Sequence, residues 1–437
     1  MAKRIGIIGG GQLGLMIAEE AHRQGALVYA LDPAQDAPAF AECDGHIVAE
    51  YDDLQALEQL GDMTDVLTYE FENVPGDILR HLEGKYSIPQ GIAPLFDSQD
   101  RLREKNNAKR HGLPVPDYIP LPACSSDEDC AEVPAVSGQC GCDDICTRPM
   151  TDAERYAELK DAVKIIGVPC VLKTRRFGYD GHGQAVIRNE SDIEKAAQMM
   201  KVPCILEAFV PFDYECSVIM VRDGKQTIHF PIGRNVHKGG ILDLCIVPAE
   251  TLYVENGKVP TELCQRIISA CEHFMEGCDY KGILAIELFI KGKEFVFNEM
   301  APRPHNSGHY TIEGCNASQY SELCHFLLGE TLIRPELTAP ALMKNILGQD
   351  LEATWRIVDH ALEEHRRNPE AAPVSDIAKI ENAYSGQAGE GVFVHIYGKT
   401  ESRPKRKMAH ITFVPMSEQE YNHFWANHFL YGKTSKG

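Results

Sequence analysis

The chain has 437 residues, of which 44% are hydrophobic, 8% aromatic and 24% charged. This is the composition of a globular protein, which excludes a disordered or fibrous chain, and the length predicts two or three domains. The 43 basic and 64 acidic residues give a formal net charge of -21, so the chain is a poor general binder of nucleic acid and must hold any anionic ligand at a local basic site.

The N-terminal sequence has no apolar stretch followed by a small-residue cleavage site, and no run of about 18 apolar residues occurs in the chain. We therefore expect a cytoplasmic protein with no membrane partner. Thiols stay reduced in that compartment, so ten scattered cysteines, of the 15 in the chain, are expected to behave as small buried apolar residues. The other five crowd one short segment: Cys124, Cys130, Cys140, Cys142 and Cys146.

The N-terminal hundred residues alternate between strand and helix patterns. Residues 4–8 and 27–31 are predicted strands, residues 15–23 between them a helix, and residues 66–69 a further strand. This order predicts a parallel sheet with helices on its faces. Residues 97–110 are predicted to form a helical connector.

Between the first strand and the helix, residues 9–14 read G-G-G-Q-L-G and match the pattern G-x-G-x-x-G, with Asp32 placed as a ribose ligand would be. By itself the pattern leaves three alternatives open: a nicotinamide or flavin site, another anionic ligand, or a structural turn. Glu70, Glu72 and Asn73 follow a later strand. They could bind a ligand at the carboxyl edge of the sheet or form a solvated helix cap.

Residues 123–150 differ from the rest because they are rich in cysteine, acidic and without apolar periodicity. We interpret them as an inserted loop, which could bind a soft metal, respond to redox conditions through a disulfide, or be inert. Regular patterns return after this loop. Strands are predicted at residues 170–173, 204–207, 217–221, 282–290, 294–299, 391–397 and 410–414, and a charged helix at residues 351–367.

One of these strands ends in Lys173 and precedes residues 178–184, G-Y-D-G-H-G-Q. The glycines would let backbone amides approach phosphate oxygens and the lysine would add a charge, although a glycine hairpin with a surface lysine is the alternative. Further along, a hairpin turn at Gly292 would place Glu287 within one residue of directly opposite Glu299. Two facing carboxylates suit magnesium with substrate phosphates, and a solvent-exposed pair is the alternative.

Two further segments are rich in polar groups. Residues 300–309 form an irregular loop dense in hydrogen-bonding side chains, of a kind that more often holds substrate than core. A basic cluster near the C-terminus is either a phosphate clamp or a solvated face. Its members are Lys399, Arg403, Lys405, Arg406 and Lys407.

In combination, residues 7–14, 69–75, 178–184, 298–308 and 406–408 resemble the 5-(carboxyamino)imidazole ribonucleotide synthetase family, ATP-grasp ligases of de novo purine synthesis. The resemblance covers most of the chain in matching order. It implies a mixed α/β and α+β protein in three parts. These are a Rossmann-like domain (1–105), an ATP-grasp module (106–330) with the insertion and a lid over about residues 172–240, and a small, mostly β C-terminal domain (331–437).

The resemblance implies that ATP phosphorylates bicarbonate to carboxyphosphate, and that the amine of 5-aminoimidazole ribonucleotide captures the carboxyl group. The implied cofactors are ATP and Mg²⁺, with bicarbonate as co-substrate, and the implied assembly is a homodimer. Three other functions stay open: a nicotinamide-dependent oxidoreductase using the glycine turn, a sibling ATP-grasp enzyme that activates formate, and a non-enzymatic nucleotide-binding regulator.

The resemblance also assigns roles by position. The expected ATP-binding residues are Arg101, Lys173, Gly178, Tyr179, Asp180, Gly181, His182, Gly183, Gln184, Glu207, Ala208, Phe209, Val210, Glu215, His237, Asn298 and Glu299. Magnesium would be held by Glu287, Asn298 and Glu299. The ribonucleotide would be bound by Gln12, Leu13, Glu70, Asn73, Lys399, Arg406 and Lys407. The expected catalytic residues are Tyr179, Asp180, Arg303, His305 and Asn306.

Overall fold

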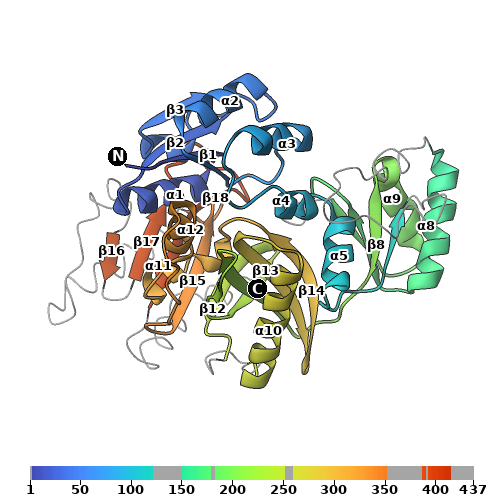
Figure 1. Cartoon of the computed structure of the whole chain (residues 1–437). Helices are drawn as coiled ribbons and strands as arrows, with labels where there is room; N and C mark the ends of the chain where they lie inside the picture. Colours follow the sequence, from blue (N-terminus) through green and yellow to red (C-terminus); the bar gives the residue numbers. More distant parts are fainter. Residues whose placement is uncertain are drawn as a thin grey trace.

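The computed structural model describes residues 2–121, 150–178, 183–250, 259–351, 386–389 and 392–414. Its N-terminal part is a four-stranded parallel sheet of order β3-β2-β1-β4 with helices packed against it (Figure 1), as the sequence predicts. The elements are β1 (Arg4–Ile8), α1 (Gln12–Arg23), β2 (Leu27–Asp32), β3 (Gly45–Val48), α2 (Leu54–Met63), β4 (Val66–Tyr69) and α3 (Gly76–Lys85).

The connector predicted over residues 97–110 is helical, but it is divided between α4 (Ala93–Ser98) and α5 (Arg101–Arg110). The chain is extended at Asp100, whose carboxylate caps α5 by accepting a hydrogen bond from the Leu102 amide at 3.0 Å. The same carboxylate accepts hydrogen bonds of 3.0 and 2.7 Å from Arg175. A buried ion pair therefore fixes the point where the two helices separate.

A second, antiparallel sheet of order β5-β8-β6-β7 stands to one side of the molecule (Figure 1). Helix α8 begins with a capping box between Thr151 and Glu154. The elements are β5 (Tyr118–Leu121), α8 (Asp152–Ile166), β6 (Cys170–Thr174), β7 (Gln184–Ile187), α9 (Ile193–Ala197) and β8 (Cys204–Ala208). The five clustered cysteines, and residues 179–182, lie outside the described residues.

The largest sheet has ten strands in the order β14-β13-β9-β11-β12-β15-β18-β17-β16, with β10 paired to β9. Because β12 pairs with β15, the C-terminal strands β15 to β18 continue this largest sheet, which is antiparallel. The predicted lid, over about residues 172–240, therefore includes strands of this sheet and of the β5-β8-β6-β7 sheet. Nearly all of the predicted helix at 351–367 lies outside the described residues. The strands are β9 (Tyr214–Arg222), β10 (Thr227–His229), β11 (Gly233–Lys238), β12 (Ile241–Val247), β13 (Gly282–Lys291), β14 (Glu294–Ala301), β15 (Ala341–Leu347), β16 (Gly386–Gly389), β17 (Val392–Ile396) and β18 (Lys407–Phe413).

Three helices accompany this sheet: α10 (Thr261–Gly277), α11 (Thr311–Gly314) and α12 (Gln319–Leu328). The ten scattered cysteines are free thiols, and eight of them are buried, as predicted, whereas Cys43 and Cys278 are half-buried. Burial raises the pKa of the Cys170 thiol to about 11, which keeps it protonated at neutral pH.

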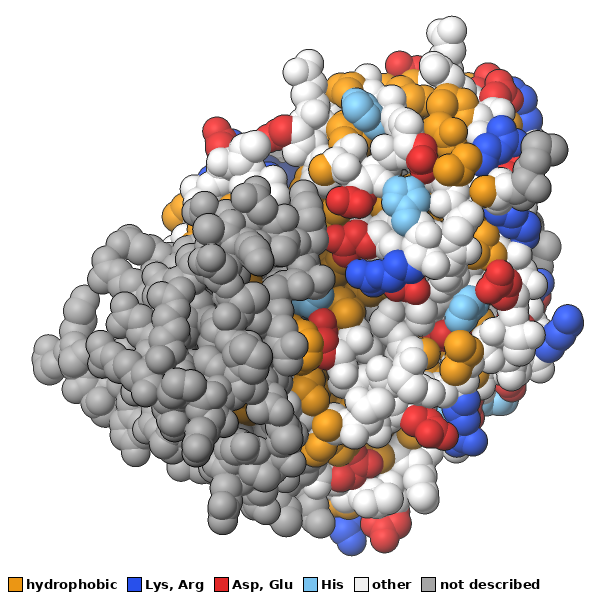
Figure 2. All heavy atoms as spheres, turned by 90° about the vertical axis from the view of Figure 1, so that its left-hand side faces the viewer, with side chains coloured by type: hydrophobic (Ala, Val, Ile, Leu, Met, Phe, Trp, Pro, Cys, Tyr) orange, Lys and Arg blue, Asp and Glu red, His pale blue; other side chains and the backbone are white. Residues whose placement is uncertain are grey.

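The surface of the protein shows how its charged side chains are distributed. On the face shown in Figure 2, acidic and basic side chains are interspersed over the described residues. The net negative charge is therefore not gathered into one acidic patch on this face.

In the part of the chain that the structure describes, no helix is both long enough and apolar enough to cross a membrane.

The Asp100–Arg175 pair yields a stability prediction, since both residues are buried, at 1% and 4% exposure. Asp100→Ala should lower the free energy of unfolding by about 3 to 5 kcal/mol, because it leaves the Arg175 charge buried without this partner. Urea denaturation followed by circular dichroism measures this change. Asp65→Ala is the matched control, because Asp65 pairs with Arg4 in solvent and should cost far less. Equal losses in the two variants would contradict the prediction.

Candidate active site

Two carboxylates face each other on β13 and β14, the last two strands at one edge of the largest sheet. Glu287 of β13 is paired in register with Glu299 of β14, which confirms the predicted juxtaposition. A bulge follows, so that Asn298 is the extra residue beside the pair. Glu287 is buried, and its pKa is raised by that burial and by the negative charge of Glu299.

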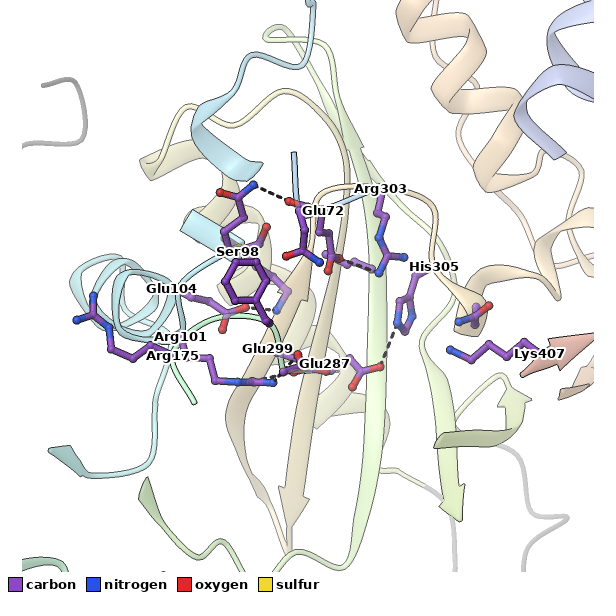
Figure 3. A pocket seen from close by; sticks show the side chains of 18 residues that line it. Glu72, Ser98, Arg101, Glu104, Arg175, Glu287, Glu299, Arg303, His305 and Lys407 are labelled. Carbon is purple, nitrogen blue, oxygen red and sulfur yellow. Dashed lines mark hydrogen bonds and ion pairs between the residues drawn. The ribbon is translucent and has the colours of Figure 1, made fainter. Parts of the chain in front are cut away.

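Cationic and neutral donors approach this carboxylate pair from different elements (Figure 3). Arg101 Nη1 donates to Glu299 Oε2 at 2.9 Å, and His305 Nε2 lies 3.4 Å from Glu287 Oε1. Removal from water raises the pKa of Glu299, but the charges of Arg101 and Lys173 outweigh this effect and leave it lowered. Glu299 is therefore the carboxylate of the pair that ionises more readily.

A buried ionic cluster lies beside the pair. Glu207 Oε2 accepts a hydrogen bond from Lys173 Nζ at 2.8 Å, and Glu207 Oε1 lies 3.2 Å from Lys105 Nζ. Burial opposes ionisation of Glu207, but the two lysines dominate and lower its pKa to about 2. Burial lowers the pKa of Lys173 despite the attraction of Glu207. The cluster thus holds Lys173 at the edge of a cavity without leaving its charge unpaired.

Two cavities, of about 290 and 140 Å³, meet at the carboxylate pair. The residues that line both are Arg101, Glu287, Glu299, His305, Asn306 and Lys407. The smaller cavity is shown in Figure 3, where His305 and Lys407 lie on one side of the pair and Arg101 on the other. This arrangement can place two ligands on opposite sides of one reacting centre.

The larger cavity brings together most of the residues predicted to bind ATP. Its lining includes Arg101, Lys173, Gln184, Glu207, Ala208, Phe209, Val210, Glu215, His237, Asn298 and Glu299. Within it, His237 Nδ1 lies 2.7 Å from Glu215 Oε2. Gly178 lines the smaller cavity, and Gly183, at φ +72°, closes the β6–β7 turn by accepting a hydrogen bond from the Thr174 amide. Of the other residues predicted for ATP, Tyr179, Asp180, Gly181 and His182 lie outside the described residues.

The predicted catalytic residues that the structure describes line the smaller cavity: Arg303, His305 and Asn306. Arg303 Nη2 is fixed by an ion pair of 2.7 Å with Glu72 Oε1. Removal from water and the charge of Arg303 lower the pKa of His305 well below its ordinary value, so this imidazole is neutral.

The residues predicted to bind the ribonucleotide are only partly brought together. Asn73 lines the smaller cavity and Lys407 lines both, whereas Leu13 is buried in the apolar core. Gln12 and Lys399 contact each other and reach the smaller cavity through Asn306. The structure places two other predicted members outside that lining: Arg406, which donates to the Glu401 carbonyl, and Glu70.

The glycine turn after β1 is occupied by carboxylates of the protein itself. Asp32 Oδ2 accepts a hydrogen bond from the Gly10 amide at 2.8 Å, and Glu70 Oε1 accepts one from the Gly11 amide at 2.6 Å. A Cβ atom at Gly11 would lie 2.8 Å from Glu70 Oε1, which explains the need for glycine there. Asp32 also accepts the Tyr51 hydroxyl at 2.7 Å. These contacts favour the structural alternative for the turn over dinucleotide binding.

Three family models match successive parts of the chain: Ribonucleotide synthetase preATP-grasp domain over residues 1–94, ATP-grasp domain over residues 143–320, and Phosphoribosylaminoimidazole carboxylase C-terminal domain over residues 341–423. The N5-carboxyaminoimidazole ribonucleotide synthase of Staphylococcus aureus (strain MRSA252) is 35% identical over 412 residues, 93% of this chain and 91% of its own length. The enzyme of that name from Bacillus subtilis (strain 168) is 34% identical over 420 residues, 95% and 93% of the two chains. The chain belongs to the N5-carboxyaminoimidazole ribonucleotide synthase family.

A crystal structure of an ADP complex of N5-carboxyaminoimidazole ribonucleotide synthetase shares the fold, with a TM-score of 0.78 and 33% identity over 98% of both chains. The family resemblance and the three-part ATP-grasp architecture that it implies are thereby confirmed. The individual residue roles stay predictions, supported by the positions described above.

Sequence reasoning missed two residues at the site of this family member. Glu104 and Lys105 lie in the predicted helical connector, to which the sequence assigns no role at the site, but both are buried beside the cavities. Lys105 Nζ donates to the Asn298 carbonyl at 2.9 Å, and Glu104 Oε1 accepts from the Met300 amide at 2.5 Å. Their spacing of three and four from Arg101 would place all three on one helix face, and this signal was available in the sequence.

Glu104 provides a pH-dependence prediction. Burial raises its pKa to about 8, against about 4.3 in an unfolded chain. The folded protein then binds the extra proton between these values, so this residue stabilises the fold below about pH 4.3 and the contribution is lost as pH rises to about 8. Glu104→Gln, which is neutral throughout, should gain stability relative to wild type as pH rises through this window. Parallel curves of unfolding free energy against pH would contradict the prediction.

Proposed function

We propose that this chain forms N5-carboxyaminoimidazole ribonucleotide with bicarbonate as carboxyl donor and magnesium as the metal. The ATP-dependent carboxylation of 5-aminoimidazole ribonucleotide in purine biosynthesis follows from membership of the family. The observation that carries the proposal is the Glu287–Glu299 pair in the wall between two cavities. A phosphoryl donor on one side and an amine on the other could both reach a carboxyl group held there.

ATP would occupy the larger cavity. Lys173 and Arg101 offer positive charge to its phosphates, and the segment from Glu207 to Val210 offers an edge for adenine. Glu215, held by His237, would accept the ribose hydroxyls. Phosphoryl transfer depends mainly on such positioning and charge neutralisation.

The residues at the carboxylate pair fit magnesium. Glu287, Glu299 and the Asn298 side chain supply oxygen donors, and the raised pKa of Glu287 shows that the pair lacks neutralising charge. No cluster of three or more histidine, cysteine or acidic residues able to hold a metal occurs among the described residues, so the ion would arrive with nucleotide phosphates. When bound, magnesium would neutralise the charge that develops on the transferred phosphoryl group.

The smaller cavity would hold the amine and the carboxyl group. Arg303, fixed by Glu72, offers a cation to an anionic carboxyl donor, and neutral His305 offers an imidazole beside it. In the second step the amine nitrogen bonds to the carboxyl carbon, the bond from that carbon to the phosphate oxygen breaks, and the amine loses one proton. Asp180 stays the predicted acceptor of that proton. Closure of the site over its ligands would protect carboxyphosphate from water.

Lys407 is the best-placed of the basic residues predicted to bind the ribonucleotide phosphate, because it lines both cavities. Lys399 and Arg406 complete the proposed phosphate site. Cytoplasmic location, expected from the sequence pattern, and homodimer formation, implied by the resemblance, are further parts of the proposal. Light scattering coupled to gel filtration tests the dimer.

The test of the reaction is ADP release by the purified protein with each substrate omitted in turn. Release should need bicarbonate and should rise when 5-aminoimidazole ribonucleotide is added, with formation of the carboxylated product. Formate-supported release with a glycinamide substrate would favour the sibling ligase instead. Absence of bicarbonate-dependent release would refute the proposal.

Glu299→Gln should lower kcat by at least about 10²-fold, because it removes one of the two facing negative charges at the reacting centre. The melting temperature should stay near that of wild type, since Glu299 faces the cavity. Glu294→Gln is the matched control, because Glu294 lies on the same hairpin in solvent, paired with Arg266. A fully active Glu299→Gln enzyme would exclude the proposed role of this carboxylate.

A further inference from the structure

A chain of hydrogen bonds connects Lys399 to the loop after β14. Lys399 Nζ donates to Gln12 Oε1 at 2.6 Å, and Gln12 Nε2 donates to Asn306 Oδ1 at 3.0 Å. An ammonium group can only donate, so Gln12 must turn its oxygen toward Lys399 and its nitrogen toward Asn306. Asn306 must in turn present its oxygen to Gln12. Only one orientation of the Gln12 and Asn306 side-chain amides therefore allows all of these hydrogen bonds. Turning either amide round would bring two donors together.

A second donor acts on the same oxygen. His309 Nε2 lies 3.1 Å from Asn306 Oδ1, and His309 Nδ1 lies 2.9 Å from the Tyr320 hydroxyl. Because Asn306 Oδ1 is an acceptor, the Nε2 atom must carry the proton, and Nδ1 then accepts from Tyr320. The imidazole is fully buried, and burial lowers its pKa well below the ordinary value, in agreement with this neutral tautomer.

Aromatic stacking holds the His309 ring in place. The ring stacks on His410 of β18 with centroids 4.3 Å apart, and His410 stacks on His395 of β17 at 4.4 Å. The Tyr397 hydroxyl contacts His410 Nδ1 at 2.9 Å. Stacking on His410 of β18 thus fixes the plane of the His309 ring, and with it the direction of the His309 Nε2 atom toward Asn306.

Asn306 lines both cavities at the carboxylate pair and is only 7% exposed. Its oxygen is taken by Gln12 and His309, so its amide nitrogen is the group left for a ligand. We infer that His309 is a positioning residue that, with the Lys399–Gln12 pair, fixes the Asn306 amide so that its Nδ2 hydrogens face the carboxyl group under transfer. This inference rests on the proposed function.

An Asn306 amide fixed in this way suits the second chemical step, in which the amine attacks carboxyphosphate. When the amine nitrogen attacks the carboxyl carbon, the carbonyl oxygen gains negative charge, which returns to the carbon–oxygen double bond as the bond to phosphate breaks. An N–H group aimed at that oxygen beforehand stabilises the charge without reorganisation during the reaction. A rotated amide would present an oxygen there and would repel it.

The test compares two replacements of His309 in the full-length protein. His309→Gln can keep an N–H donor near the position of Nε2, whereas His309→Met fills a similar space without a donor. His309→Met should lower kcat by about 10²-fold, the effect of losing one oriented donor, while its affinity for ADP stays at the wild-type level. His309→Gln should recover most of kcat. Wild-type kcat in His309→Met would overturn the inference.

A double-mutant cycle separates positioning from a general structural effect. If His309 acts through Asn306, then His309→Met should lower kcat no further in an Asn306→Ala background. Independent, multiplicative losses would overturn the inference. Tyr320→Phe is the second route if His309→Met does not fold, because it removes only the hydroxyl that donates to His309 Nδ1 and helps to hold the Nε2 proton toward Asn306. It should lower kcat with unchanged ADP affinity, and unchanged kcat would again overturn the inference.

Failure of this inference and failure of the proposed function give different results. If the proposed function is wrong, wild-type protein releases no ADP in response to bicarbonate and the ribonucleotide. If only the positioning role is wrong, wild-type protein is active and His309→Met and Tyr320→Phe match it.

Discussion

The mutual repulsion of two carboxylates, Glu287 and Glu299, is the constraint on which the rest of the site depends. Facing each other on neighbouring strands, they cannot both ionise unless positive charge is close by. Arg101 supplies part of that charge and lowers the pKa of Glu299, whereas the pKa of Glu287 remains raised. The remaining demand for positive charge is what the proposed magnesium ion would meet.

Helix α5 links this centre to the second antiparallel sheet. Its first residue, Arg101, binds Glu299, and Lys105 one turn later contacts Glu207 of β8. Directly before the helix, Asp100 binds Arg175, which follows β6. One short helix therefore carries ionic contacts to both walls of the larger cavity. Movement of the β5-β8-β6-β7 sheet would thus be coupled to the electrostatics of the carboxylate pair.

Much of the fold and part of the site could be predicted from local pattern. The strand positions and the pairing of Glu287 with Glu299 follow from apolar runs and the length of a hairpin, which are properties of neighbouring residues. Burial of Glu104 and Lys105 could not be read in the same way. Ionisable side chains are buried only where distant partners satisfy them. Here those partners are Glu207 and the Asn298 carbonyl for Lys105, and the Met300 amide for Glu104.

The sequence by itself determined the order of elements, the family and the types of residue available for phosphate, metal and carboxyl chemistry. The tertiary structure alone decided how those groups are used. It showed that the amides of the glycine turn bind Asp32 and Glu70, and that Gln12 and His309 both contact the Asn306 side-chain oxygen. The physical reason is that a hydrogen bond has a direction set by both partners, and these partners meet only when distant segments of the chain pack together.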